Sequence, residues 1–453
     1  MRTSRSGLWL PAQDDDREDL TLIVETPDGT YVRRVPPALP LPAHTDHGRG
    51  AEEATHTAAA TWGLPDFVFQ QAAHAVKGSG VRELGDRLLL AGRRGAVVQV
   101  KARTVDPKSD ADEAAWIGKV AAKAMRQAKG TVRQLRLQSA DMVNGRSRTL
   151  RIDGNAFEWI AVFLLDHPRV PPGTLASWAA PGMPAIALTR RDWDFLFDQL
   201  RSTTAVLDYL FRAAAEPAVA LDNEPVRYYE LAAADAVAPP KDIDTDLVGE
   251  GGTLFSGPQL PREPAGSDGT NAHLMIRIML EDIALTSLDA SLTESDRFTV
   301  LSDLDRLPVS ARAEWGHLLR DMLRDVPLVP AEHVKWRFRR LLHEDNTGQL
   351  IVGAATCFDP TVQGAFAAYV QLRHHEVTNR TGRAEESSTL GVLLTPRHDG
   401  RRPWDTSTVR VHGDLALPPE DLKIYQEGWN RAFDEGSVVD AARTGGPQSS
   451  ATT

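Results

Sequence analysis

The segment RELGDRLLLAGRRGAVVQVKAR, residues 82–103, is the main basis for the fold that we expect for this chain. Two runs of apolar, strand-forming residues, 87–91 and 96–102, flank the polar tetrapeptide Gly92-Arg93-Arg94-Gly95. Short glycine-containing segments between such runs are typical of a β-hairpin. Strand and helix signals alternate around it from about residue 62 to 235, so we predict a hairpin inside an α/β layer.

Three polar side chains belong to this hairpin. Asp86 opens the first strand, and Gln99 and Lys101 lie two residues apart on the second, so the latter two share a face. Pairing across the tight turn can bring Asp86 beside them. Mg²⁺ prefers oxygen ligands, and phosphodiester hydrolysis also needs a cation near the scissile phosphate. A carboxylate, an amide oxygen and an ammonium on one face therefore point to metal-dependent phosphodiester chemistry.

The pattern Asp86…Gln99-Val100-Lys101 resembles the PD-(D/E)xK (restriction endonuclease-like) superfamily. In that superfamily an acid begins one strand and an acid-x-Lys element follows on the next. The glutamine version is similar to the Mrr-like branch, and the resemblance covers about residues 83–133. It implies that Asp86 and Gln99 bind Mg²⁺ or Mn²⁺ and that Lys101 acts on the phosphate or the nucleophile.

The resemblance also suggests auxiliary residues. Glu83 is a candidate second acid, and Asp66 is a weak candidate for the helix-borne acid that the family carries upstream. A helix with polar residues is expected beside the site after the hairpin. Lys123 and Gln127 are the residues of that helix that we expect to contact phosphate.

The expected helix spans about residues 110–135, with Asp110 as its N-cap. At 100° per residue, Trp116, Ile117, Val120, Ala121 and Ala124 form a core face, and Lys119, Lys123 and Arg126 gather on another. A solvated amphipathic helix would show the same pattern. The nucleic-acid-binding residues that we predict are Lys119, Arg126, Lys129 and Arg103.

Charge is unevenly distributed along the chain. The net charge is −11, yet residues 77–151 hold 17 Lys and Arg against 7 Asp and Glu, and six of the nine lysines lie between Lys77 and Lys129. A basic island in an acidic chain is the pattern expected where one module meets a polyanion. A solvated basic helix face is the other explanation.

Local composition and the positions of Gly- and Pro-rich segments suggest how the chain is divided into domains. We expect an N-terminal extension, partly disordered, over residues 1–60, a nuclease-like domain over 61–238, a Gly- and Pro-rich linker over 239–269, a second α/β or α+β domain of unknown role over 270–442, and a disordered tail over 443–453. In the second block, helices are predicted at 272–285 and 311–326, and strands at 349–356, 390–396 and 408–415.

The cysteine content and the apolar runs of the sequence indicate where in the cell the protein is expected. Cys357 is the single cysteine, so no internal disulfide is expected, and no run approaches the about 18 apolar residues of a membrane span. The start carries arginines without an apolar core, so we expect no secretory signal and a cytoplasmic location. The abundance of Arg, Ala, Gly and Pro is typical of high-GC bacteria, where such a nuclease could serve restriction or phage defence.

The prediction is therefore an α/β protein with a restriction-endonuclease-like mixed sheet flanked by helices, acting as a metal-dependent nuclease with DNA as the favoured substrate. A homodimer is plausible because duplex cutting needs two active sites. The alternative is a catalytically inactive nuclease-fold module that binds nucleic acid or a protein partner in a defence or repair complex; Gln99 in place of an acid favours it. A third possibility is a purely structural or protein-interaction role. In that case Asp86 would be a turn residue and Lys101 would be a lysine that protects a sheet edge from pairing.

Overall fold

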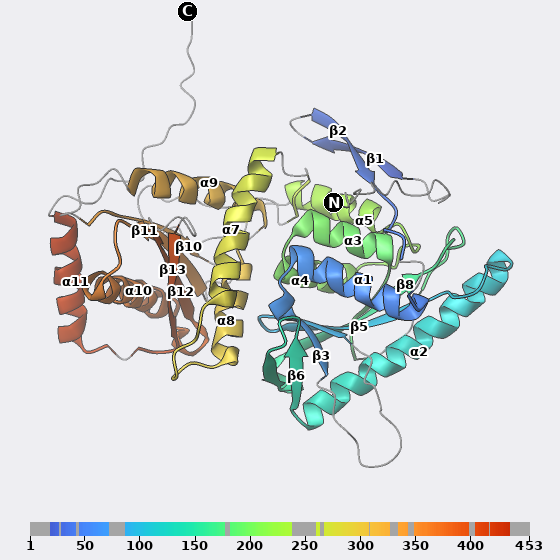
Figure 1. The fold of residues 1–453 in the computed structure, drawn as a ribbon, viewed down its shortest axis with the longest axis horizontal. Helices are drawn as coiled ribbons and strands as arrows, with labels where there is room; N and C mark the ends of the chain where they lie inside the picture. Colours follow the sequence, from blue (N-terminus) through green and yellow to red (C-terminus); the bar gives the residue numbers. More distant parts are fainter. Residues whose placement is uncertain are drawn as a thin grey trace, which may run out of the picture.

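The computed structural model describes most of the chain. The described residues are 19–26, 29–41, 45–71, 87–176, 182–237, 260–262, 267–307, 309–326, 334–342, 348–397, 404–415 and 417–434. They form two mixed sheets, one of seven strands and one of four, and a separate two-stranded ribbon. Helices cover both sheets (Figure 1). The predicted α/β class is confirmed at this level.

The seven-stranded sheet has the order β7-β6-β3-β4-β5-β8-β9. The elements of this half are β1 (Leu20–Thr26), β2 (Gly29–Val35), α1 (His47–Trp62), η1 (Pro65–Phe67), β3 (Val68–Gln71), β4 (Arg87–Ala91), β5 (Arg94–Ala102), α2 (Asp110–Leu137), β6 (Ala140–Asn144), β7 (Thr149–Ile152), η2 (Gly154–Ala156), β8 (Glu158–Asp166), β9 (Ala185–Thr189), α3 (Arg190–Leu200), α4 (Thr203–Ala215) and α5 (Glu224–Val237).

The predicted hairpin is confirmed as β4 and β5. The strands pair antiparallel from Ala91↔Arg94 to Arg87↔Val98, so only Gly92 and Arg93 form the turn. Gly92 has φ +57°, a left-handed conformation that glycine adopts without a steric penalty. The turn is tighter than the four residues expected, and β5 therefore begins at Arg94.

β5 is an interior strand of the sheet because its other edge pairs parallel with β8. Two parallel neighbours need a crossover, and the connection between β5 and β8 includes α2, which packs on one face of both strands. α1, α3 and α4 lie on the opposite face (Figure 1). Val98 and Val100 face that second layer, whereas Val97 packs in the cluster beneath α2.

The crossover helix α2 ends two residues later than expected, at Leu137, and its N-cap lies one residue earlier than predicted. Ser109, not Asp110, accepts the hydrogen bond from the Asp112 amide. Ile117, Ala121 and Ala124 are buried as predicted, and Trp116 and Val120 are partly buried against them. The core face of the helix is thus confirmed.

The region assigned to an N-terminal extension contributes to the first half. α1 buries Ala51 and Ala59 in the main core cluster, and Val24 and Val35 of the β1–β2 ribbon join the same cluster. Arg33 of β2 forms an ion pair with Asp198 of α3. The packed unit therefore begins before residue 61. Residues 1–18 and the predicted tail 443–453 lie outside the described residues.

The second half contains the four-stranded sheet, in the order β10-β11-β12-β13. Its elements are α7 (Ser267–Leu285), α8 (Glu294–Asp305), α9 (Val309–Asp325), β10 (Trp336–Leu342), β11 (Gly348–Ala355), α10 (Pro360–Thr381), η4 (Ala384–Glu386), β12 (Ser388–Pro396), β13 (Trp404–His412) and α11 (Pro419–Asp434). The helices and strands predicted here are present, and sequence reasoning missed β10, α8, α10 and α11.

Both sheets share one connection pattern. In the first, the antiparallel hairpin β4–β5 is followed by α2, and β8 then pairs parallel with β5. In the second, the antiparallel pair β10–β11 is followed by α10, and β12 then pairs parallel with β11. No sequence repeat indicated this shared connectivity.

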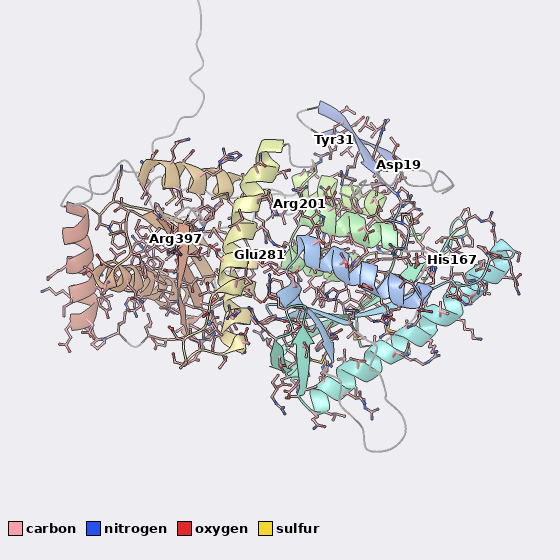
Figure 2. The ribbon with its side chains drawn as sticks, viewed as in Figure 1. Asp19, Tyr31, His167, Arg201, Glu281 and Arg397 are labelled. Carbon is pink, nitrogen blue, oxygen red and sulfur yellow. The ribbon has the colours of Figure 1, made fainter. Side chains whose placement is uncertain are left out.

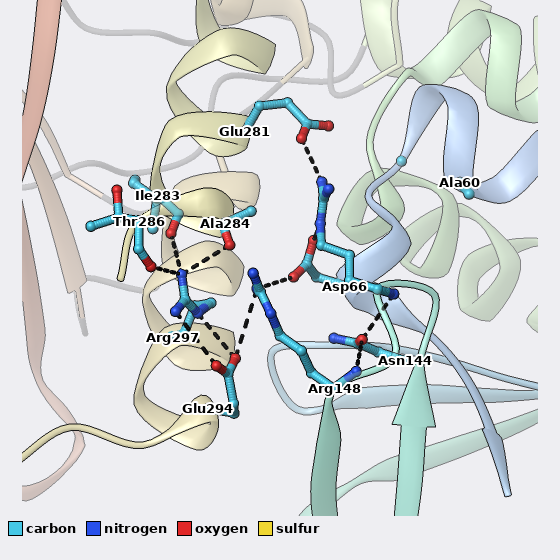
Figure 3. Close-up of polar contacts among 12 residues, drawn as sticks. Ala60, Asp66, Asn144, Arg148, Glu281, Ile283, Ala284, Thr286, Glu294 and Arg297 are labelled. Carbon is cyan, nitrogen blue, oxygen red and sulfur yellow. Dashed lines mark hydrogen bonds and ion pairs between the residues drawn. The ribbon is translucent and has the colours of Figure 1, made fainter. Parts of the chain in front are cut away.

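Helices α7 and α8 join the two halves (Figure 1). Phe298 of α8 packs edge-on against Phe67 and Phe69 of the first half. Beside this contact, alternating charges form a continuous ionic chain, drawn in part in Figure 3. In order, the ionic chain comprises Arg277, Glu281, Arg146, Asp66, Arg148, Glu294 and Arg297. None of the described helices combines the length and the apolar character needed to cross a membrane.

Candidate active site

Gln99 and Lys101 lie side by side on the face of β5 that is turned toward α2. Strand alternation sets both on the side of Val97, and β8 places Phe163 and Leu165 next to them. Gln99 is 3% exposed, and Lys101 is half-buried. Lys101 Nζ donates a hydrogen bond to Gln99 Oε1 at 3.3 Å. The amide oxygen and the ammonium are therefore held together on an interior strand of the seven-stranded sheet.

The acids predicted for this site, Asp86 and Glu83, lie outside the described residues. Asp86 directly precedes Arg87 in sequence, and Arg87 pairs with Val98, which directly precedes Gln99. Within the described ranges, no group of three or more His, Cys, Asp or Glu side chains could hold a metal ion. The described part of the hairpin offers the amide oxygen of Gln99 as a metal ligand. A divalent ion there would also need the carboxylate of Asp86.

Arg103, predicted to bind nucleic acid, is instead engaged in a buried cluster at the end of β5. Its Nε and one terminal nitrogen donate to the two carboxylate oxygens of Glu113, each at 2.8 Å, and its guanidinium lies over the Trp116 ring. His167 Nε2 is 2.9 Å from the same carboxylate. The side chains of Glu113 and His167 are 1% and 0% exposed.

This cluster locks the first turn of α2 onto the ends of β5 and β8. Hydrogen bonds from Arg103, from the Lys108 amide and from His167 lower the pKa of Glu113 to about 2. Glu113 also lies in the first turn of α2, where the helix dipole favours a carboxylate. Nothing in the sequence pattern paired it with His167, which lies 54 residues further along the chain.

The auxiliary residues of α2 occupy different sides of the helix. Lys123 is exposed on the outward face. Gln127 is exposed and lies seven residues after Val120, on the side of the helix nearer β8 and β9. Lys129 lies four residues after Met125, on the flank that packs toward β4. Lys129 is therefore better placed for the hairpin face than Gln127.

Lys119 and Arg126 are exposed on the outward face of α2, as predicted. Asp66, the weak candidate for an upstream acid, is not directed at the hairpin. It is 3% exposed and forms ion pairs with Arg146 and Arg148 in the ionic chain between the halves (Figure 3). Its role there is structural, because two arginines neutralise its carboxylate.

A second histidine–carboxylate pair lies on the opposite face of β8. Asp166 precedes His167, so the two side chains point to opposite sides of the strand. Asp166 is buried, accepts from His47 of α1 at 2.8 Å and pairs with Arg190 of α3. This pair fastens two helix starts to the end of β8. Figure 2 labels His167 at this end of the first half.

The second sheet has no counterpart of the Gln99–Lys101 pair. Counted from the first parallel pairs, Arg94↔Glu158 and Gly348↔Ser388, the positions equivalent to Gln99 and Lys101 are Gly353 and Ala355. A side chain at Gly353 would collide with the Phe338 ring. The equivalent space is therefore filled by an aromatic side chain, and the chemistry-bearing groups belong to the first sheet. No protein-family model, curated protein or solved structure matches this chain.

Proposed function

We propose that the protein is a metal-dependent nuclease that hydrolyses nucleic-acid phosphodiesters, with DNA as the substrate and the β4–β5 hairpin as the active site. The observation that carries the proposal is the Gln99–Lys101 pair, which holds an ammonium at a fixed place on an interior strand. Catalytic groups held on rigid strands are positioned more accurately than groups on loops. The resemblance to the PD-(D/E)xK superfamily suggests which role Asp86, Gln99 and Lys101 each have in the reaction.

In this proposal Lys101 donates to the scissile phosphate and stabilises the negative charge that develops on it. Gln99 orients Lys101 by accepting its hydrogen bond at Oε1, and the same amide oxygen would be the metal ligand. Asp86 and Gln99 would hold Mg²⁺ or Mn²⁺. The bound ion would supply Lewis-acid polarisation of the phosphoryl oxygen and a more acidic water.

The test is cleavage of supercoiled plasmid and of single-stranded DNA with Mn²⁺ or with EDTA. The proposal predicts cleavage by the wild type with Mn²⁺ only, and none by a folded Asp86→Ala variant. Cleavage that persists in Asp86→Ala would exclude the hairpin as the active site.

A second candidate is an inactive nuclease-fold module that binds nucleic acid or a protein partner, in a defence or repair complex. The neutral amide of Gln99 favours it, because an amide adds no negative charge to a site for a divalent cation. Calorimetric titration with Mn²⁺ separates the two candidates. An enzyme should bind Mn²⁺ and lose that binding in Asp86→Ala, whereas an inactive module shows neither effect.

A further inference from the structure

Helix α2 carries a row of cations that no acid accompanies. From Ala114 to Ala140 the chain contains no Asp or Glu. Five exposed cations lie in that stretch, and we refer to them as the α2 cation track: Lys119, Lys123, Arg126, Arg133 and Arg136. Lys129 lies within the same stretch but is half-buried.

The α2 cation track differs from the arginines of the other described elements. Many of those are matched to an acid, as Arg94 is to Asp208, Arg212 to Asp235 and Arg410 to Asp303. None of the five track residues forms an ion pair with any residue that the structure describes. In a chain with a net charge of −11, this helix is therefore a concentrated, unneutralised positive surface.

The track is continuous along the helix. Lys119, Lys123, Arg126 and Arg133 follow one another at intervals of four, three and seven residues, which sets them on one outward face. Arg136 lies eleven residues after Met125, and thus on the flank that packs toward β4. From Lys119 to Arg136 the helix rises by about 25 Å at 1.5 Å per residue. Figure 1 shows α2 along the outside of the first half.

The surface between the cations is small and polar. A Cβ atom added at Gly130, between Arg126 and Arg133, would meet nothing within 4 Å, so a ligand backbone can approach the helix closely there. Leu137, 76% exposed at the last residue, is the one large apolar side chain fully exposed on this helix. Protein interfaces have an apolar and aromatic centre, and helices on membrane surfaces need an apolar face. A phosphate backbone needs only spaced cations.

We propose that the α2 cation track binds the sugar–phosphate backbone of a nucleic-acid polymer along the outward face of this helix. A length of about 25 Å corresponds to about seven nucleotides at 3.4 Å per nucleotide. The substrate is thus a polymer and not a mononucleotide. The identity of the polymer rests on the proposed nuclease function, but its binding does not require cleavage.

The experiment measures binding of a fluorescent 20-base-pair DNA duplex by anisotropy, in EDTA so that no hydrolysis occurs. Lys119→Glu/Arg126→Glu is compared with Arg380→Glu/Arg383→Glu, two exposed arginines at the end of α10 that change the net charge equally. We expect at least tenfold weaker binding for the track pair and wild-type binding for the control pair. Lys119→Gln/Arg126→Gln, expected to weaken binding several-fold, covers the case in which the glutamates impair folding.

Salt dependence gives a second reading of the same complex. Each phosphate contact adds about 0.9 to the slope of log Kobs against log salt concentration for duplex DNA. Lys119→Ala/Lys123→Ala/Arg126→Ala should therefore lower the magnitude of the slope by about 2 to 3. An unchanged slope would contradict direct phosphate contacts by these residues.

Two outcomes would overturn the inference. One is equal duplex binding by the track pair and the control pair. The other is full competition by AMP or by poly-glutamate at an equal concentration of negative charge, because either would show a general anion surface. Failure of the nuclease function is distinguishable: a protein that binds DNA through the track but never cuts it refutes the hairpin chemistry alone.

Discussion

At the residue scale, the proposed chemistry of the hairpin depends on the Gln99 amide oxygen, which accepts a hydrogen bond from Lys101 and would also bind the metal ion. Gln99→Glu would keep the acceptor and add a negative charge. We therefore predict tighter Mn²⁺ binding for Gln99→Glu than for the wild type, and weaker binding for Gln99→Leu, by calorimetric titration. Equal affinities in all three proteins would place the metal elsewhere.

The buried Glu113 also makes a residue-scale prediction about pH. Its pKa is lowered to about 2, below the usual 4.5, so its ionised form stabilises the folded state. That contribution is present above pH 4.5 and is lost as the pH falls through about 2. Glu113→Gln should therefore lower the Tm at pH 7. The difference from the wild type should shrink between pH 4.5 and 2 in thermal melts followed by circular dichroism.

The sequence was sufficient to predict Gln99 and Lys101 on one strand face, because that geometry depends on residues two positions apart. It was not sufficient to predict the fate of Arg103. The same residue type at the same strand end could reach solvent or Glu113, and only the packing of α2 on β5 brings Glu113 within 2.8 Å. Contacts between distant residues, such as Glu113 with His167, leave no local signal.

At the element scale, the hairpin and α2 were predictable because turn chemistry and helical periodicity are local. The strands that each flank of α2 contacts could not be predicted, because helical periodicity does not identify the neighbours of a helix. Val120 packs toward β9 and Met125 toward β4, and this decides that Lys129, not Gln127, lies on the hairpin side.

Gly130 offers a prediction at this scale. It lies in the interior of α2, where an added methyl group meets no atom within 4 Å. Replacing glycine by alanine in a helix interior stabilises it by about 0.5–1 kcal/mol. Gly130→Ala should therefore raise the free energy of unfolding by about that amount in urea denaturation. A lower value would mean that the site is not open in the folded protein.

At the scale of the whole molecule, the ionic chain fixes the second half against the edge of the first sheet. Asp66 stands at its centre, buried and paired with two arginines. Removing one partner from a buried charge network costs about 3–5 kcal/mol. We predict that Asp66→Ala loses about this much stability and separates the unfolding of the two halves into two calorimetric transitions.

Glu281→Gln is the matched control, because Glu281 lies nearer the surface in the same ionic chain. Glu281→Gln should lower the free energy of unfolding by less than Asp66→Ala does, and the protein should still unfold in a single calorimetric transition. The sequence predicted a linker between the two halves and did not predict that the halves pack together. Composition indicates where a chain can be flexible, but it does not indicate which helices pack between two halves. A single transition in Asp66→Ala would show that the apolar contacts of Phe298 suffice to couple the halves.

The proposed hydrolysis of phosphodiesters by the β4–β5 hairpin is tested by the initial rate of Mn²⁺-dependent DNA cleavage by Lys101→Met. Loss of one group that stabilises transition-state charge costs about 10²–10³ in rate. We predict a loss of at least about 100-fold in Lys101→Met with an unchanged Tm, and a much smaller loss in the control Lys423→Met, at an exposed lysine of α11. Cleavage at the wild-type rate by Lys101→Met would contradict the assignment.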